Sequence, residues 1–288
     1  MDAAMSKGLC LHLAYLFREV AFLERFGLAA ATGFAGVEFS EPRQASKEAI
    51  AERLEKSGLE LVQFTTSSFA TPERKQVGLA AVPGRSDDFR RDCEALVPYV
   101  ELLRPKYVHA MAGIIEDGYS FNACYETYQK NIRFAHDAFK SVGTGILIEP
   151  INSVDVPGYF MNEIAFCARA IDDMGLPNVA IMFDAYHLAR SGHDPVASFQ
   201  SFFDKIAHVQ IADSPGRHEP GTGRIAYQDL FDAIGGSGYG GWISCEYFPE
   251  GDTRKGLEWT RGISSKRYDL SGIARLTETT GGEDGAKV

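Results

Sequence analysis

Short apolar runs alternate with longer segments of helical period along the whole chain. Each short run holds four to six residues, many of them Val, Ile, Leu or aromatic, which is typical of buried strands. The segments between the runs repeat apolar residues every three or four positions, as amphipathic helices do. Strands are therefore predicted over residues 9–14, 36–39, 59–64, 107–111, 145–149, 179–184, 206–211 and 242–246. Helices are predicted near residues 19–32, 46–57, 86–103, 121–142, 160–174, 194–203, 227–234 and 253–277.

The strict alternation of strand and helix predicts a parallel sheet, because each helical crossover brings the next strand back in the same direction. Eight such units predict a single (β/α)8 barrel of the TIM type over residues 1–280, followed by a frayed tail over 281–288. The competing architecture, an open doubly wound sheet, requires a glycine-rich turn directly after an early strand, and residues 8–36 hold none. The chain matches Gly-x-Gly-x-x-Gly only at 236–241, after a predicted helix, so we expect a helix C-cap and a tight loop there.

The charge composition limits which kinds of molecule the protein can bind. The 288 residues include 39 Asp plus Glu against 29 Lys plus Arg, for a net charge of −10. A surface of this sign repels nucleic acid and anionic lipid, and no apolar run approaches the roughly 18 residues of a membrane span. We therefore expect a small-molecule substrate, with no nucleic acid and no membrane partner. The sequence does not decide the oligomeric state, and a homo-oligomer is one of the alternatives.

The cysteines and the N-terminus indicate the compartment. The five cysteines are scattered and form no Cys-x-x-Cys pair, which favours reduced, mostly buried thiols in a cytoplasmic protein. The apolar run after Lys7 imitates a secretory signal. Arg18 and Glu19 follow it at once, where a signal would have small residues before its cleavage site, so a first buried strand is the favoured interpretation.

Four consecutive predicted strands end in an oxygen-bearing side chain. These residues are Glu149, Asp184, Gln210 and Glu246, separated by 35, 26 and 36 residues, each close to one strand-helix unit. Because the carboxyl ends of all strands in a parallel barrel meet on one face, the four side chains are expected side by side on its rim. An all-oxygen set of three carboxylates and one amide suits Mg²⁺ or Mn²⁺, whereas zinc prefers histidine or thiolate.

The alternative for these acids is that each pairs with a separate Arg or Lys. The ends of the four strands hold no Arg or Lys, which favours the metal site. Three further residues are candidates for contact with substrate. Arg217 is predicted to hold a substrate carboxylate, His187 to donate to a developing enediolate oxygen, and His109 is a third candidate near the end of the fourth strand.

Motifs along nearly the whole chain carry a family resemblance. They are FREV at 17–20, FLERF at 22–26, GLAAVPGR at 78–85, IEPIN at 148–152, PGYF at 157–160, DAYH at 184–187, HVQIA at 208–212, RHEP at 217–220 and GWISCEY at 241–247. With these motifs the sequence resembles the hydroxypyruvate isomerases, within the xylose-isomerase-like barrels of sugar isomerases and epimerases.

The resemblance implies that Glu149, Asp184, Gln210 and Glu246 bind the divalent metal and that Glu149 and Glu246 also form the acid/base pair. It implies substrate contacts from His187 and Arg217. It also implies the interconversion of hydroxypyruvate and tartronate semialdehyde through a cis-enediolate, without an organic cofactor.

The chain departs from the family pattern in the first and third strands. His12 stands where the family usually has Asn, and residues 64–67 read Phe-Thr-Thr-Ser where Phe-Asn-Thr-Pro is usual. A longer substrate, a 2-oxotetronate or a ketose undergoing 3-epimerisation, therefore stays open. So does a barrel that binds sugar without catalysis. An endonuclease of the same fold would need more histidine ligands and a basic face, which the net charge of −10 argues against.

Overall fold

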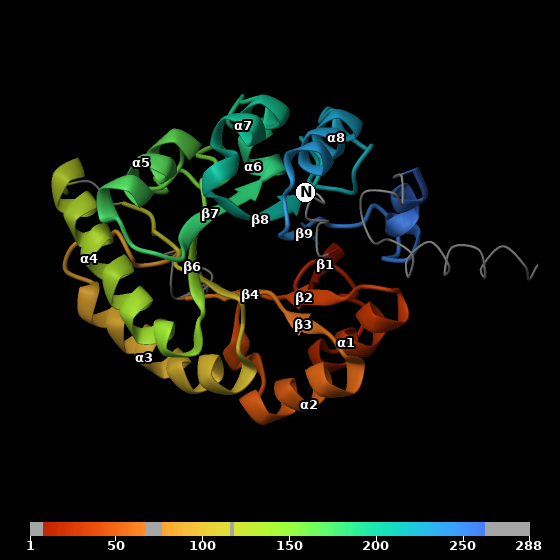
Figure 1. Cartoon of the computed structure of the whole chain (residues 1–288), viewed down its shortest axis with the longest axis horizontal. Helices are drawn as coiled ribbons and strands as arrows, with labels where there is room; N and C mark the ends of the chain where they lie inside the picture. The colour runs from red at the N-terminus through yellow and green to blue at the C-terminus, as the bar shows by residue number, and fades with distance from the viewer. Residues whose placement is uncertain (1–7, 67–76, 116–117, 263–288) are drawn as a thin grey trace, which may run out of the picture.

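A closed parallel barrel surrounded by helices forms the core of the molecule (Figure 1). The computed structural model describes residues 8–66, 77–115 and 118–262. The strands are β1 (Gly8–His12), β2 (Gly36–Glu38), β3 (Glu60–Leu61), β4 (Gln63–Thr65), β5 (Tyr107–His109), β6 (Gly145–Ile148), β7 (Val179–Asp184), β8 (Ile206–Ile211) and β9 (Trp242–Cys245). Every pairing between them is parallel, in the order β3-β2-β1-β9-β8-β7-β6-β5-β4.

The sheet closes through Val62, which separates β3 from β4. The Val62 N–H donates to the Val37 carbonyl of β2, and the Val62 carbonyl accepts from the Tyr107 N–H of β5. β3 and β4 are therefore two parts of one strand, and the labelled strands amount to the eight that the apolar runs predict. The predicted barrel is confirmed, and the open sheet is wrong.

Helices cover the outside of the barrel in a ring (Figure 1). They are α1 (Phe22–Ala31), α2 (Lys47–Ser57), α3 (Ser86–Leu103), α4 (Phe121–Phe139), α5 (Ile164–Met174), α6 (Ala185–Arg190), α7 (Pro195–Phe202) and α8 (Tyr227–Ser237). Short 3₁₀ helices are η1 (Pro42–Gln44), η2 (Lys140–Val142), η3 (Phe203–Lys205) and η4 (Lys255–Gly262). No helix within these described ranges combines the length and the apolarity that a membrane span requires.

Two helical predictions differ from the structure. Residues 253–277 were expected to form a helix, and their described part is the 3₁₀ helix η4, while the rest lies outside the described residues. The short helix α6 was not expected, because it begins directly at the end of β7, without the connecting loop that usually marks a new element. The tail at 281–288 also lies outside the described residues.

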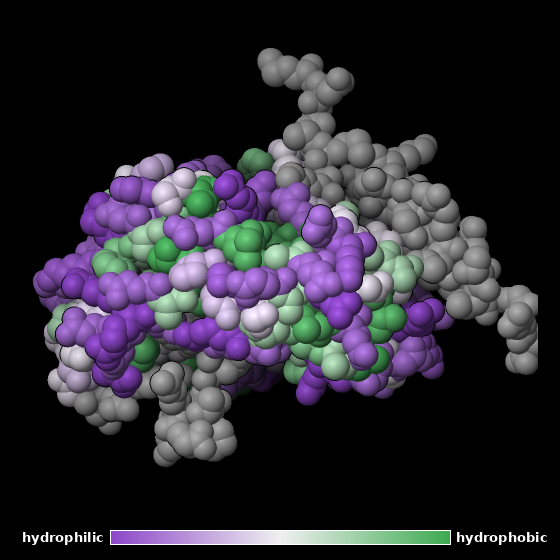
Figure 2. Space-filling model, turned by 90° about the horizontal axis from the view of Figure 1, so that it is seen from below, coloured by the Kyte–Doolittle hydropathy of each residue, from purple (hydrophilic) through white to green (hydrophobic). Residues whose placement is uncertain are grey.

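Burial of the strands follows from their apolar sequences. All residues of β1, β2, β4, β6 and β9 are buried, as expected for strands covered by helices on one side and by the barrel interior on the other. The five cysteines are buried and free, which confirms their prediction. Seen from the side that carries α2 and α3, the surface is mostly hydrophilic with smaller hydrophobic areas between (Figure 2).

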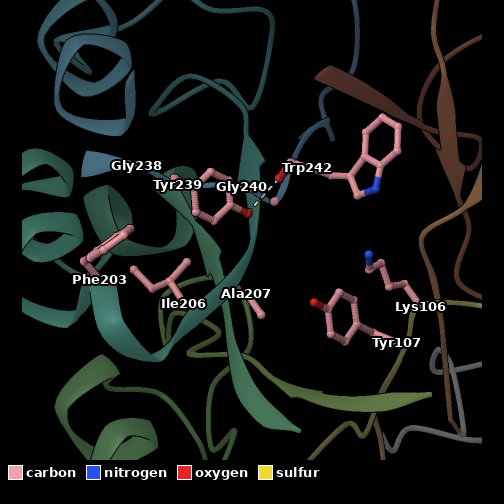
Figure 3. A pocket seen from close by; sticks show the side chains of 10 residues that line it. Lys106, Tyr107, Phe203, Ile206, Ala207, Gly238, Tyr239, Gly240 and Trp242 are labelled. Carbon is pink, nitrogen blue, oxygen red and sulfur yellow. Dashed lines mark hydrogen bonds between the residues drawn. The ribbon is translucent and has the colours of Figure 1, made fainter. Parts of the chain in front are cut away.

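The glycine-rich segment lies at the amino-terminal end of the barrel. Gly238 caps α8 with a left-handed φ of 78°, which confirms the predicted C-cap. A cavity of about 240 Å³ opens beside it, and Figure 3 shows Lys106, Tyr107 and Trp242 around this space. Because barrel enzymes place their chemistry at the opposite, carboxyl-terminal face, this cavity is a poor candidate for an active site.

Candidate functional site

A small cavity of about 90 Å³ lies at the carboxyl ends of the strands, lined by both polar and apolar side chains. Each of the eight barrel strands, or a residue one or two positions after it, contributes to its wall. The contributing residues include His12, Ser40, Gln63, Thr65, His109, Glu149, Met182, Gln210 and Glu246. Residues from distant parts of the sequence meet here because all the strands run in one direction.

Three carboxylates are buried around this cavity. Glu149 follows β6, Asp184 ends β7 and Glu246 follows β9, and their exposed fractions are 5%, 0% and 7%. One Arg217 Nη2 joins two of them, at 2.7 Å from Glu246 Oε1 and 3.6 Å from Asp184 Oδ2. Asp184 and Glu246 thus share a single arginine from the loop after β8, whereas the alternative expected a separate Arg or Lys for each acid.

The loop after β8 holds Arg217 in place. Asp213 accepts backbone N–H bonds from Ser214, Gly221 and Ile225 at 2.8 to 3.1 Å. Arg217 itself has a left-handed φ of 58°, a conformation that non-glycine residues seldom adopt. The loop therefore fixes the direction in which the guanidinium enters the site.

Two tyrosine rings enclose the same guanidinium. Its carbon lies 5.0 Å from the Tyr15 ring centre and 4.9 Å from the Tyr186 ring centre. Cation–π contact of this kind favours the charged form in a buried place. The charge on Arg217 is therefore a permanent part of the site.

Asp184 has one oxygen engaged and one free. It is the N-cap of α6, where Oδ1 accepts from the Tyr186 N–H at 2.8 Å. Oδ2 is buried and has no hydrogen-bond partner in the described part of the chain, although the charged Arg217 lies 3.6 Å away. The cap therefore fixes the carboxylate and leaves its second oxygen for another ligand.

Burial and mutual repulsion raise the pKa of all three carboxyls. Burial is the largest cause, and it raises the pKa of Asp184 to about 7 and that of Glu246 to about 7, against the opposing effect of Arg217. The pKa of Glu149 lies well above its usual value because of burial and the neighbouring charges of Glu246 and Asp184. Such a cluster holds protons near neutral pH and releases them when a cation enters.

Glu38, at the end of β2, is a buried carboxylate that the sequence analysis missed. It accepts hydrogen bonds from His208 Nε2 at 2.7 Å, Gln210 Nε2 at 2.8 Å and Ser244 Oγ at 2.7 Å. Burial alone would raise its pKa, but the charge and hydrogen bond of His208 and the proximity of His12 lower it to about 2. Glu38 is therefore an ionised anchor inside the barrel. Its position at the end of the second predicted strand is the sequence signal that could have identified it.

Glu38 also determines which atom Gln210 presents to the cavity. An ionised carboxylate only accepts, so the amide nitrogen of Gln210 must face Glu38. The amide oxygen Oε1 is buried and has no hydrogen-bond partner among the described residues. The register of β7 and β8 sets Gln210 directly opposite Asp184. Two unsatisfied oxygens therefore lie on neighbouring strands.

These oxygens fit a divalent cation. An unpartnered buried oxygen is costly, and Asp184 Oδ2 and Gln210 Oε1 both lack a donor within the described ranges. Potential ligand atoms of Glu149, Asp184 and His187 lie within 4.8 Å of one another, as do those of His12, Glu38 and Glu246. The site therefore has the donors for a metal ion.

The predicted histidines both lie in the site. His187 is on α6, with Nε2 3.7 Å from Glu149 Oε1 and 3.6 Å from Asp184 Oδ2. His109, at the end of β5, has Nδ1 3.7 Å from Glu149 Oε2. Burial lowers the pKa of His109 to about 3 and that of His187 well below its usual value, so both rings are neutral.

Comparison with known proteins gives consistent results. A family model described as xylose isomerase-like TIM barrel matches residues 26–263. Hydroxypyruvate isomerase of Escherichia coli (strain K12) is 38% identical over 250 residues, which cover 86% of this chain and 96% of that protein. A 2-oxo-tetronate isomerase of Cupriavidus necator is 37% identical over 252 residues, covering 87% and 96%.

A solved structure shares the fold closely. The crystal structure of AP endonuclease, family 2 from Brucella melitensis superposes with a TM-score of 0.83 at 37% identity, over 89% of this chain and 99% of that chain. The similarity therefore extends over nearly the whole barrel.

Proposed function

Because the chain belongs to the xylose isomerase-like TIM barrel family, we propose that it is a divalent-metal-dependent isomerase of small 2-oxo hydroxy acids. The reaction is the interconversion of hydroxypyruvate and tartronate semialdehyde, or the equivalent reaction of a 2-oxotetronate. The observation that carries the proposal is the cluster of three buried carboxyls with raised pKa values around a small cavity at the carboxyl ends of the strands.

We expect Glu149, Asp184, Gln210 and Glu246 to hold Mg²⁺ or Mn²⁺. The all-oxygen donor set supports these ions over zinc. When bound, the ion polarises the carbonyl and hydroxyl oxygens of the substrate and stabilises the negative charge that develops on them. The amide of Gln210, fixed by Glu38, is the neutral member of the set.

Glu149 and Glu246 are the proposed acid/base pair. One carboxylate removes a proton from C3 of hydroxypyruvate, giving an enediolate, and a proton is then delivered to C2, while the hydroxyl proton moves from the oxygen on C3 to the oxygen on C2. No atoms are gained or lost. The pKa of Glu246, raised to about 7, supports this role, because a base with a pKa close to the working pH transfers protons in both directions, and burial raises the pKa of Glu149 as well.

The neighbouring cations and histidines complete the proposed site. Arg217 lies with its Nη2 beside Glu246 and has a buried Nε without a partner among the described residues, so it has a donor available for a substrate oxygen. His187 and His109 are proposed substrate contacts as well. With a net charge of −10, the protein needs the positive charge of Arg217 to attract an anionic substrate.

The size of the cavity supports a short substrate. Its volume of about 90 Å³ favours a three- or four-carbon acid over a six-carbon ketose. The names of the two curated relatives, a hydroxypyruvate isomerase and a 2-oxo-tetronate isomerase, agree with this range. A 3-epimerase of longer ketoses is the less favoured alternative.

The name of the Brucella melitensis structure raises the endonuclease alternative. A phosphate backbone would have to approach a protein of net charge −10, and the cavity wall includes the carboxyls of Glu149 and Glu246 beside a single arginine, Arg217.

Deuterium exchange tests the proposal. The protein is incubated in deuterated water with Mg²⁺ or Mn²⁺ and with hydroxypyruvate, a 2-oxotetronate or a six-carbon ketose, and deuterium uptake into carbon-bound positions is measured by mass spectrometry after quenching. We expect uptake with the three- or four-carbon acid and not without metal. Absence of uptake from every substrate would overturn the proposal and favour a barrel that binds sugar without catalysis.

A further inference from the structure

Asn152 lies behind His187, on the side away from the carboxylates. It is fully buried and follows β6 by four residues, in the same loop as Glu149. Its Nδ2 lies 2.6 Å from His187 Nδ1, and its backbone nitrogen lies 3.4 Å from the same atom. The other ring nitrogen of His187, Nε2, faces Glu149 and Asp184.

The orientation of the Asn152 amide is fixed by Asp155. Asn152 Oδ1 accepts from the Asp155 backbone N–H at 2.8 Å, and Asn152 Nδ2 donates to Asp155 Oδ2 at 3.0 Å. Rotating the amide by 180° would set an oxygen against a carboxylate and a donor against a backbone N–H. Only one orientation satisfies both contacts, and it directs an N–H of Asn152 at His187.

Asp155 is itself held firmly. Tyr186 donates to its Oδ2 at 2.7 Å, and Arg190 donates to its Oδ1 at 3.1 Å. Both partners belong to α6, the helix that also carries His187. The contacts therefore form a loop: α6 holds Asp155, Asp155 orients Asn152, and Asn152 contacts His187, which is itself on α6.

A donor aimed at Nδ1 requires that this nitrogen accept. A neutral imidazole has one protonated nitrogen, so the proton of His187 must be on Nε2. A nitrogen that carries a proton donates a hydrogen bond and does not coordinate a metal ion. The proximity of His187 to Glu149 and Asp184 would otherwise make it a candidate ligand.

We propose that Asn152 is a positioning residue that holds His187 in the Nε2–H tautomer, so that His187 faces the site as a hydrogen-bond donor to a substrate oxygen and not as a metal ligand. The assignment of the tautomer stands on the contacts alone, while the donation to substrate rests on the proposed isomerase function. Partners of this kind, one contact removed from the reacting groups, typically contribute about 10- to 100-fold to activity.

Nitrogen NMR of the ¹⁵N-histidine-labelled protein tests the tautomer directly. The His187 signals are assigned by their loss in His187→Gln, and spectra are recorded metal-free and with Mg²⁺. We expect an unprotonated Nδ1 and a protonated Nε2 in both states. A proton on Nδ1, or loss of the Nε2 proton on addition of Mg²⁺, would overturn the proposal.

Two substitutions connect the tautomer to activity. Asn152→Asp replaces the hydrogen-bond donor by an acceptor, and Asn152→Ala removes it. In each variant we expect the Nε2–H tautomer of His187 to be no longer the dominant one. We also expect kcat for deuterium exchange to fall about 10- to 100-fold, with a smaller change in KM. Asp155→Asn is the matched control, since it keeps an acceptor for Asn152 Nδ2 and should keep the tautomer. If Asn152→Asp does not fold, Asn152→Ala and the wild-type spectrum decide.

The outcomes separate this proposal from the proposed function. A fall in activity with an unchanged tautomer would make Asn152 a merely structural residue, and a changed tautomer with unchanged exchange would remove its positioning role. Wild-type protein that exchanges no substrate at all would overturn the isomerase function, while its NMR spectrum would still decide the tautomer.

Discussion

Two sets of buried carboxylates lie close together in this barrel and behave in opposite ways. Glu38 accepts three hydrogen bonds from residues of β8 and β9, which are not adjacent to β2 in the sheet, and has a pKa lowered to about 2. Asp184 and Glu246, at the rim, have pKa values raised to about 7 by burial, and Glu149 is raised as well. All four are buried, so burial alone does not decide the charge of an acid.

The difference lies in the donors that surround each group. Glu38 is saturated by His208, Gln210 and Ser244, and its negative charge stabilises the fold. Asp184 and Glu246 share one arginine, and Asp184 Oδ2 has no hydrogen-bond partner among residues the structure describes. An acid that is buried without enough donors indicates a place prepared for a ligand.

The largest expected effect comes from Glu149→Gln. The amide cannot accept the substrate proton, so we expect deuterium exchange to fall about 10²- to 10⁴-fold while the melting temperature stays close to that of the wild type. Glu126→Gln, in an exposed pair with Lys130 on α4, is the control and should exchange at the wild-type rate. Equal rates for Glu149→Gln and the wild type would remove Glu149 from the chemistry.

Glu38→Gln should mainly affect stability. It replaces an ionised acceptor by an amide and leaves buried donors of His208 and Gln210 without a charged partner, which we expect to lower the free energy of unfolding by about 3 kcal/mol. Chemical denaturation measures this change. A loss below about 0.5 kcal/mol, the range of an exposed pair, would mean that Glu38 does not anchor the barrel.

The two sets should also differ in their pH dependence. The folded pKa of Asp184, about 7, lies above its usual value, so its contribution to the stability of the metal-free protein is present at acid pH and is lost as the pH rises towards 7. Asp184→Asn should remove part of this loss. The free energy of unfolding at pH 8 minus that at pH 5 should therefore be about 2 kcal/mol higher in Asp184→Asn than in the wild type.

Glu38 has the opposite sign. Its folded pKa of about 2 lies below its usual value, so its contribution is complete above about pH 4.5 and is lost as the pH falls towards 2. Chemical denaturation of the metal-free proteins, at each pH where they are folded, measures how the free energy of unfolding changes with pH for both groups. An identical pH dependence in Asp184→Asn and the wild type would contradict the contrast between the two sets.

The smallest effect is expected at the surface. Glu52 and Lys56 form an exposed pair four residues apart on α2. Glu52→Gln should change the free energy of unfolding by no more than about 0.5 kcal/mol. A larger change would mean that exposed charge, and not burial with few donors, controls the stability of this protein.

The sequence predicted the barrel well because its strands are buried on both faces, which produces continuous apolar runs that are easy to recognise. The helix predicted near residues 46–57 is α2, and Ser46 is its N-cap, with its hydroxyl accepting from the Ala49 N–H. The helix α6 was missed because Asp184 ends a strand and caps a helix at the same position.

The spacing of the strand ends predicted the positions of Glu149, Asp184 and Glu246. It did not predict which side chains contact them. The contact of Glu38 with Gln210 joins β2 to β8, residues 172 apart in sequence, and no local pattern predicts which side chains meet inside the barrel. The role of Asn152 depends in the same way on the orientation of an amide. Pairing across the barrel interior is visible only in three dimensions.

A metal titration followed by thermal unfolding tests the central claim most directly. After treatment with EDTA, the wild-type protein is titrated with Mn²⁺ and its melting temperature is compared with that of Asp184→Asn. At a concentration 100 times the dissociation constant, binding stabilises the folded state by about 2.7 kcal/mol, or roughly 5–10 °C for a protein near this size. We predict this rise for the wild type and little or none for Asp184→Asn. An equal rise in both proteins, or none in the wild type, would contradict the claim that the rim carboxylates are prepared for a cation.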